Sequence, residues 1–214
     1  DIIQQELSSK QLQKIYKLKN NEIHRQKELV EEAHKEITDS INYAERIQRS
    51  FLATSDLLNE NLGEHFVFFQ PKDVVSGDFY LAGKLANGNF AMVNADSTGH
   101  GVPGAIMSIL NISSIEGAIK EGAKKPNEIF NRARTLIIDR LSKDGSDQGG
   151  KDGMDASIIS FDFKNNKVSY TAAQNPIWIV RNKKIIELKG EKMPVGKHDN
   201  DTIPFVGGEF DIQK

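Results

Sequence analysis

The first 53 residues contain neither glycine nor proline and are rich in glutamine, lysine and glutamate. This composition favours a single long helix. At 1.5 Å per residue the helix would extend on the order of 80 Å, which is too long for one small domain to bury. The chain is therefore predicted to have two parts, a helical linker of residues 1–53 and a globular domain of residues 54–214.

A seven-residue apolar repeat runs along the predicted helix. Its first row is Ile23, Val30, Ile37, Ala44 and Phe51, and its less regular second row is Gln26, Ala33, Ser40 and Ile47. Two such rows are typical of the a and d positions of a coiled coil. We expect a parallel homodimeric coiled coil that leads into the globular domain. The alternative is a solvated helix that packs on its own domain.

Beyond residue 54, apolar runs predict strands, then two helices, then more strands. The predicted strands are 66–69, 78–85, 90–96, 157–163, 167–173, 177–181 and 184–188, and the predicted helices are 102–119 and 126–141. Grouped strands and helices favour an α+β fold with antiparallel sheets over a doubly wound parallel sheet. Residues 143–155, with four glycines and four aspartates, are predicted to form a mobile loop.

Composition excludes several classes of function. The 28 basic and 30 acidic residues nearly balance, which gives no support for nucleic-acid binding. Cysteine is absent, so disulfides, zinc–thiolate sites and thiol nucleophiles are excluded, and a reducing compartment is indicated. No apolar run approaches about 18 residues, the length of a membrane span. We expect a cytoplasmic protein, or the cytoplasmic part of a membrane-anchored sensor.

Two aspartates are the candidate metal ligands. Asp78 and Asp96 each follow or begin an apolar run and each lies close to glycine, which lets the backbone approach a ligand. A carboxylate at the end of a buried strand is costly unless something pairs with it. Mg²⁺ and Mn²⁺ prefer such oxygen ligands. The alternative interpretation is that both aspartates only form turns.

The segment Gly99–His100–Gly101 precedes a predicted helix and is typical of an anion-binding turn. His100 could serve as a general acid, a phosphate contact or a turn residue. The segment is not a nucleotide-binding P-loop, because the Gly-Lys-Ser/Thr ending is missing. A nucleophile elbow of the Gly-x-Ser-x-Gly kind is also absent from the sequence.

The motifs Ser76-Gly77-Asp78-Phe79-Tyr80 and Asp96-Ser97-Thr98-Gly99-His100-Gly101-Val102-Pro103-Gly104-Ala105 closely resemble the two metal loops of the SpoIIE-type serine/threonine phosphatases. This family is the bacterial branch of the metal-dependent type 2C protein phosphatases. Further matches are Ser40-Ile41-Asn42-Tyr43-Ala44 with Ile47-Gln48, Asp152-Gly153-Met154-Asp155, and Asn175-Pro176. The resemblance covers residue 38 to the end.

The resemblance implies a β-sandwich flanked by helices, with two Mg²⁺ or Mn²⁺ ions between the sheets. It implies that Asp78 binds one ion, that Asp96 bridges both, and that the Ser97 carbonyl adds a backbone ligand. A metal-bound hydroxide would then attack phosphoserine or phosphothreonine directly. The implied substrate is a phosphorylated protein similar to an anti-anti-sigma factor, and the helical linker would join the domain to an N-terminal sensor.

The sequence departs from the family pattern near its C-terminus. The resemblance implies two further metal aspartates there, and neither is found. Asp155 matches neither, and a role in ordering its loop is favoured over metal ligation. Lys72 is interpreted as a solvated lysine, with attraction of a phosphorylated substrate as the alternative. We therefore expect a truncated, inactive domain that binds one ion or none.

Two other functions stay open at this point. One is a non-catalytic coiled-coil module for signalling and dimerisation, a pseudophosphatase. The other is a metal-dependent phosphohydrolase that acts on small molecules.

Overall fold

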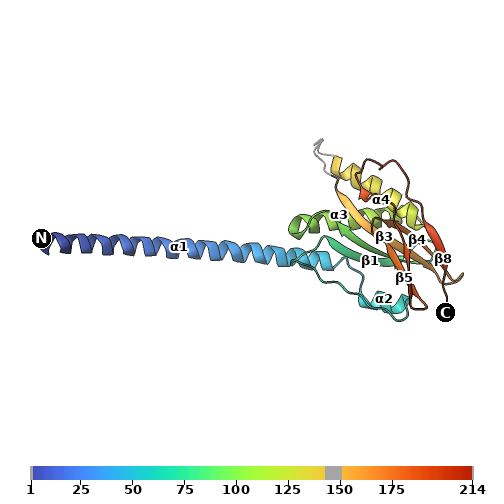
Figure 1. Cartoon of the computed structure of the whole chain (residues 1–214), viewed down its shortest axis with the longest axis horizontal. Coiled ribbons are helices and arrows are strands. Elements are labelled where there is room, and N and C mark those ends of the chain that lie inside the picture. Colours follow the sequence, from blue (N-terminus) through green and yellow to red (C-terminus); the bar gives the residue numbers. More distant parts are fainter. Residues whose placement is uncertain (1, 143–150, 214) are drawn as a thin grey trace. The chain divides into compact units, whose positions relative to one another are not determined.

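The computed structural model describes residues 2–142 and 151–213, without the side chains of residues 2–10. The chain divides into two compact units, Asp1–Ala44 and Glu45–Lys214. The long helix α1 spans Ile2–Arg49 (Figure 1). Its residues up to Ala44 belong to the first unit, and its last residues, from Glu45 on, belong to the second. The long helix is thus confirmed, while the domain boundary after residue 53 stays a prediction.

The apolar repeat lies exposed along α1. Ile23, Val30 and Ile37 keep 61%, 67% and 59% of their surface accessible. Phe51 does not continue this row, because α1 ends at Arg49 and Phe51 packs against the main core of the second unit. The first row of the repeat therefore ends at Ala44.

The second unit is built on an antiparallel sheet in the order β1-β2-β3-β4-β8, and the short β7 also pairs with β3. Its strands are β1 (Asp78–Lys84), β2 (Phe90–Ser97), β3 (Gly153–Asp162), β4 (Lys167–Ala173), β7 (Val195–Gly196) and β8 (Gly208–Asp211). A separate hairpin, β5 (Ile177–Arg181) with β6 (Lys184–Leu188), forms a second sheet.

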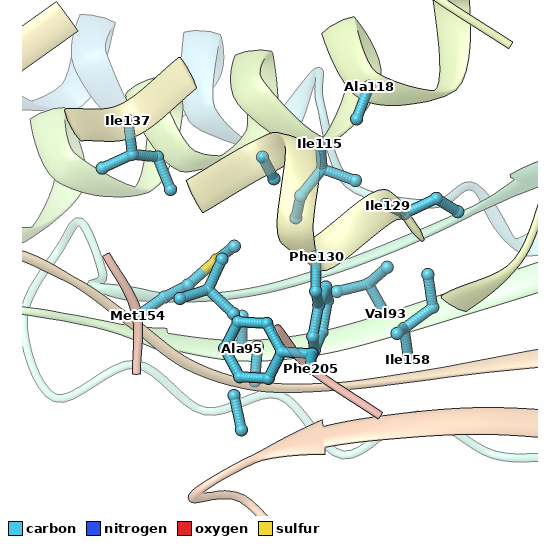
Figure 2. Close-up of a cluster of buried hydrophobic side chains, with 14 of the residues drawn as sticks. Val93, Ala95, Ile115, Ala118, Ile129, Phe130, Ile137, Met154, Ile158 and Phe205 are labelled. Atoms are coloured by element: carbon cyan, nitrogen blue, oxygen red, sulfur yellow. The ribbon is translucent and has the colours of Figure 1, made fainter. Parts of the chain in front are cut away.

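Two helices cover one face of the large sheet (Figure 1). They are α3 (Gly101–Lys120) and α4 (Pro126–Leu141). Figure 2 shows Ile115 and Phe130 of these helices above Val93 and Ile158 of the strands. All four side chains are at most 5% exposed. By length and composition α3 could cross a membrane, but its apolar character is explained by this packing.

The opposite face of the sheet is covered only in part. At one end α2 (Ser55–Asn61) contributes Leu58 to a small apolar cluster with Phe90 of β2. Residues 66–69 run near Tyr80 and line an apolar groove on this face. The strand predicted for residues 66–69 is wrong, because this segment pairs with no strand in the described part of the chain.

The predicted fold class is confirmed: antiparallel sheets, flanking helices and a long N-terminal helix form an α+β structure. The predicted strands 167–173, 177–181 and 184–188 are confirmed without change. Residues 143–150 of the predicted mobile loop lie outside the described residues. Residues 153–155 of that loop are instead the start of β3, because they pair with β2 and β7.

Candidate metal centre

Three aspartates form a row across adjacent strands. The strand register places Asp78 of β1 directly opposite Asp96 of β2, and Asp96 directly opposite Asp155 of β3. Successive side chains of a strand point to opposite faces of a sheet. Because the neighbours Phe79 and Ala95 are buried in the core under the helices, the aspartates lie on the other face of the sheet.

The structure thus brings the two predicted ligands Asp78 and Asp96 together and adds Asp155 to them. Sequence reasoning missed Asp155 because it assigned this residue to a loop. The register becomes visible only once β3 is extended to Gly153, which moves residues 153–155 from the predicted loop into a strand.

The row is electrostatically strained. Burial, the negative charge of Asp96 and a hydrogen bond with its carboxyl group raise the pKa of Asp78 from 3.8 to about 6. Burial and the charge of Asp96 also raise the pKa of Asp155. Repulsion of this kind is relieved by a divalent cation, which favours the ionised form of all its ligands.

The side chains of Asp78, Asp96 and Asp155 offer carboxylate oxygens as ligands. Such oxygens are the ligands that Mg²⁺ and Mn²⁺ prefer. Within residues 11–142 and 151–213, however, no three histidine, aspartate or glutamate side chains are arranged closely enough to hold an ion. The row is therefore a partial set of ligands, to which water and backbone carbonyls would add.

The two motifs that resemble metal loops, Ser76–Tyr80 and Asp96–Ala105, touch each other without space for a side chain between them. The Ser97 N–H donates to the Gly77 carbonyl at 3.2 Å. A Cβ atom at Gly77 would lie 2.7 Å from the Gly99 carbonyl oxygen, and one at Gly104 would lie 2.5 Å from the same atom. Glycine is therefore required at both positions for this close approach. The carbonyl of Ser97 stays a predicted ligand.

Asn111 is a buried polar residue that the sequence analysis did not single out. It lies in the apolar helix α3 with no exposed surface. Its amide nitrogen donates to the Ser97 hydroxyl at 3.0 Å and to the Gly153 carbonyl at 3.1 Å. Asn111 thus ties the end of β2 to the start of β3, two residues before Asp155. An asparagine inside an otherwise apolar helix is the sequence signal for such a role, since buried amides require partners.

The predicted anion-binding turn opens α3 as expected. Gly99 and Gly101 have φ angles of +91° and +60°, a conformation that glycine adopts readily. His100 precedes the first residue of α3, and its Nδ1 lies 3.6 Å from an oxygen of Asp73. The contact with phosphate predicted for Gly99, His100 and Gly101 stays a prediction.

An open cleft of about 580 Å³ adjoins the aspartate row. Asp96 and Asp155 lie on its wall, and Thr98, His100, Lys151 and His198 also line it. Lys151 forms an ion pair with Asp199 at 3.0 Å. A cleft that combines acidic and basic groups can accommodate both a cation and a phosphoryl group. Lys72 is exposed and does not line this cleft, but it lines a smaller adjoining pocket together with Asp78 and Asp96, and its attraction of a phosphorylated substrate stays a prediction.

The raised pKa of Asp78 makes cation binding depend on pH. Because a proton competes with the metal for a carboxylate of pKa about 6, Mn²⁺ affinity should be about tenfold weaker at pH 5 than at pH 7. Isothermal titration calorimetry at both values measures this ratio. Equal affinities at pH 5 and pH 7 would contradict the involvement of Asp78.

The raised pKa of Asp78 also makes the free energy of unfolding depend on pH. The pKa in the folded chain lies above the ordinary value of 3.8, so the folded state binds more protons than the unfolded state between these values. The Asp78 contribution to the free energy of unfolding of the metal-free chain therefore decreases as the pH rises from about 4 to about 6.

Comparisons with known proteins identify the family and the fold of this chain. The family model described as Stage II sporulation protein E (SpoIIE) matches residues 86–213. The solved structure of the SiaA-PP2C domain of Pseudomonas aeruginosa is 30% identical with a TM-score of 0.73, and the match covers 85% of this chain and 69% of that one. No curated protein sequence shows a significant match.

Two further structures share the fold at lower identity. The PP2C phosphatase domain with a regulatory fragment of SpoIIE from Bacillus subtilis is 16% identical with a TM-score of 0.51 over 65% of this chain and 39% of that one. The RsbU and RsbW domains of a Mycobacterium tuberculosis protein are 17% identical with a TM-score of 0.51 over 66% of this chain and 37% of that one. The chain therefore belongs to the SpoIIE family, the bacterial branch of the PP2C-type phosphatase domains.

Proposed function

We propose that residues 54–214 are the catalytic part of a metal-dependent serine/threonine phosphoprotein phosphatase in a bacterial signalling pathway. The observation that carries this proposal is the register that sets Asp78 opposite Asp96 at one end of the sheet. Family membership supplies the reaction class, and the paired carboxylates supply the ligands.

In this proposal Asp78, Asp96 and the Ser97 carbonyl hold Mg²⁺ or Mn²⁺. Such an ion, when bound, lowers the pKa of a coordinated water and neutralises charge on the phosphoryl oxygens. Asp155 increases the negative potential of the row and so favours a divalent cation over a monovalent one. Asn111 and the glycines of the two loops keep the ligands in place.

The proposed substrate is a phosphoserine or phosphothreonine on a regulator similar to an anti-anti-sigma factor. The open cleft beside Asp96 gives a phosphorylated side chain access from outside. Its polar lining of Thr98, His100 and Lys151 suits a phosphate group. The substrates implied by the resemblance to SpoIIE-type phosphatases support a regulatory protein as substrate over a small metabolite.

The test is Mn²⁺-dependent release of phosphate from phosphoserine proteins. We expect activity from the protein as its gene encodes it. Residues 1–214 should bind a single ion and be largely inactive, because the two further aspartates implied by the family are absent from this sequence. Failure of the gene product to hydrolyse any phosphoserine protein with Mn²⁺ or Mg²⁺ would overturn the catalytic proposal.

The second candidate function is a non-catalytic module for signalling and dimerisation. The exposed apolar row of α1 favours a role in self-association. In both candidates we propose that residues 1–53 form a homodimeric coil that connects to an N-terminal sensor, and that the protein acts in the cytoplasm. A gene product without the two further aspartates and without activity would favour the module.

The coiled-coil proposal predicts the effect of two charged substitutions. Val30→Asp with Ile37→Asp should weaken dimerisation at least tenfold, because the a positions would then bury unpaired charges of like sign. Analytical ultracentrifugation measures the dissociation constant. Thr38→Asp adds a charge outside both rows and should leave it unchanged. A wild-type chain that is monomeric at high concentration would contradict the coil.

A further inference from the structure

The two-residue strand β7 holds a cleft-lining loop against the start of β3. Both of its residues are buried, and they pair antiparallel with the first two residues of β3. Directly after β7, the Lys197 N–H donates to the Asp152 carbonyl at 3.2 Å. The Lys197 side chain forms an ion pair with Asp201 at 2.9 Å. The loop after β7 is therefore fixed beside the strand that carries Asp155.

His198 lies in this loop and lines the cleft whose wall also contains Asp96 and Asp155. Its Nδ1 accepts a hydrogen bond from the Asn200 N–H at 3.1 Å. Because a backbone N–H can only donate, Nδ1 carries no proton, and the proton of the neutral ring is on Nε2. In the described part of the chain nothing is hydrogen-bonded to Nε2. The loop thus fixes the orientation and tautomer of the ring and leaves one N–H donor unused.

The unused donor suits a phosphoryl group in the same cleft. A phosphoryl group that approaches an ion held by Asp96 enters this cleft, and its remaining charged oxygens bind strongly to N–H donors. Two other polar side chains of the cleft are already engaged. Lys151 forms its ion pair with Asp199, and the Thr98 hydroxyl is hydrogen-bonded to the backbone of β3. His198 therefore adds a donor that needs no contact to be broken first.

We propose that His198 is a substrate-binding residue, whose Nε2–H donates a hydrogen bond to a phosphoryl oxygen of the phosphoserine or phosphothreonine substrate. This inference rests on the proposed function and deepens it by adding a residue on the side of the cleft formed by the loop after β7. The short strand β7 then has a function, which is to bring this donor from a distant part of the sequence to the cleft beside Asp155.

The test uses a substitution that removes the donor and keeps the loop. In His198→Asn the side-chain oxygen can take the place of Nδ1 and accept from the Asn200 N–H, as asparagine does in turns, while nothing replaces Nε2. In the gene product with Mg²⁺, the inhibition constant of inorganic phosphate and the KM for a phosphoserine protein should rise about tenfold or more, because a hydrogen bond to a charged group is lost. The value of kcat and the midpoint of thermal unfolding should change little.

His198→Gln makes the opposite exchange. Its longer side chain can place an amide N–H near the position of Nε2, but it gives up the acceptor for the Asn200 N–H. We expect both constants to stay within about threefold of wild type and the unfolding midpoint to fall. A purely structural role of His198 predicts the reverse order, with the asparagine variant mild and the glutamine variant damaging.

His65 offers a matched control. It is exposed, and its Nδ1 lies 3.0 Å from the Gly63 carbonyl oxygen, also a contact with the backbone two residues away. His65 lines neither of the two pockets that contain Asp96. His65→Asn should therefore leave the KM and the inhibition constant of inorganic phosphate unchanged.

The outcomes separate the two proposals. A gene product that releases no phosphate from phosphoserine proteins would refute the proposed function. An active wild type with unchanged constants in His198→Asn would refute the role of His198 alone, as would equal losses in His198→Asn and His65→Asn. If His198→Asn does not fold, or the gene product is inactive, NMR of the wild-type protein decides. Inorganic phosphate added with Mg²⁺ should shift the nitrogen signal of His198 Nε2, and an unshifted signal would also refute the proposal.

Discussion

Replacing Asp96 by asparagine is expected to weaken Mn²⁺ binding and to lower phosphatase activity of the gene product by at least about 100-fold, more than the loss of an outer partner of a ligand causes. Asp96 is the central member of the aspartate row, with Asp78 on one side and Asp155 on the other. Its removal takes away the proposed bridging ligand. Calorimetric titration and phosphate release measure the two effects.

Asp96→Asn should also change the pKa of the neighbouring Asp78 in the metal-free chain. The pKa of Asp78 should fall from about 6 toward 3.8, because the charge and the hydrogen bond of Asp96 contribute to the shift. Carboxyl carbon chemical shifts followed by NMR against pH measure this. Glu187→Gln, exposed on β6, is the matched control and should change neither binding nor the Asp78 titration. A variant Asp96→Asn with wild-type Mn²⁺ affinity would remove Asp96 from the site.

A single methyl group at Gly104 is expected to destabilise the domain by about 3 kcal/mol, at the upper end of the usual cost of overpacking. The added Cβ in Gly104→Ala would lie 2.5 Å from the carbonyl oxygen and 2.8 Å from the carbonyl carbon of Gly99. These are backbone atoms, so α3 or the Asp96–Gly101 loop must move. Urea unfolding measures the loss, and a weaker Mn²⁺ affinity should accompany it.

Gly83→Ala provides the comparison for this substitution. Gly83 lies in β1, and a Cβ atom there would meet no atom within 4 Å. We expect its effect on the free energy of unfolding to stay within about 0.5 kcal/mol. If Gly104→Ala were as mild as Gly83→Ala, the close contact between the start of α3 and the Asp96–Gly101 loop would be incorrect.

Local sequence patterns predicted the elements that depend on local chemistry. The absence of glycine and proline predicted α1. The predicted strands 177–181 and 184–188 match β5 and β6, and Asn182 and Lys183 between them have φ angles of +53° and +60°. Asp78 and Asp96 were found because each lies at one end of an apolar run and close to a glycine. The motifs around them were specific enough to identify the family.

Features that depend on distant parts of the chain were not predictable in this way. Asp155 joins the row only through pairing of β3 with β2, and Gln48 meets Ser76 across 28 positions of sequence. The apolar run 66–69 looked like a strand, but strand formation requires a partner. The two-residue strand β7 is too short to leave a periodic signal.

The most direct test of the paired aspartates is the place where Mn²⁺ binds. Substoichiometric Mn²⁺ added to the isotopically labelled chain broadens the amide signals nearest the ion. We predict that the signals of Gly77, Asp78 and Ser97 disappear first, and that Asp96→Asn abolishes this selectivity. Broadening centred on another part of the molecule, or the same pattern in Asp96→Asn, would contradict a metal centre between Asp78 and Asp96.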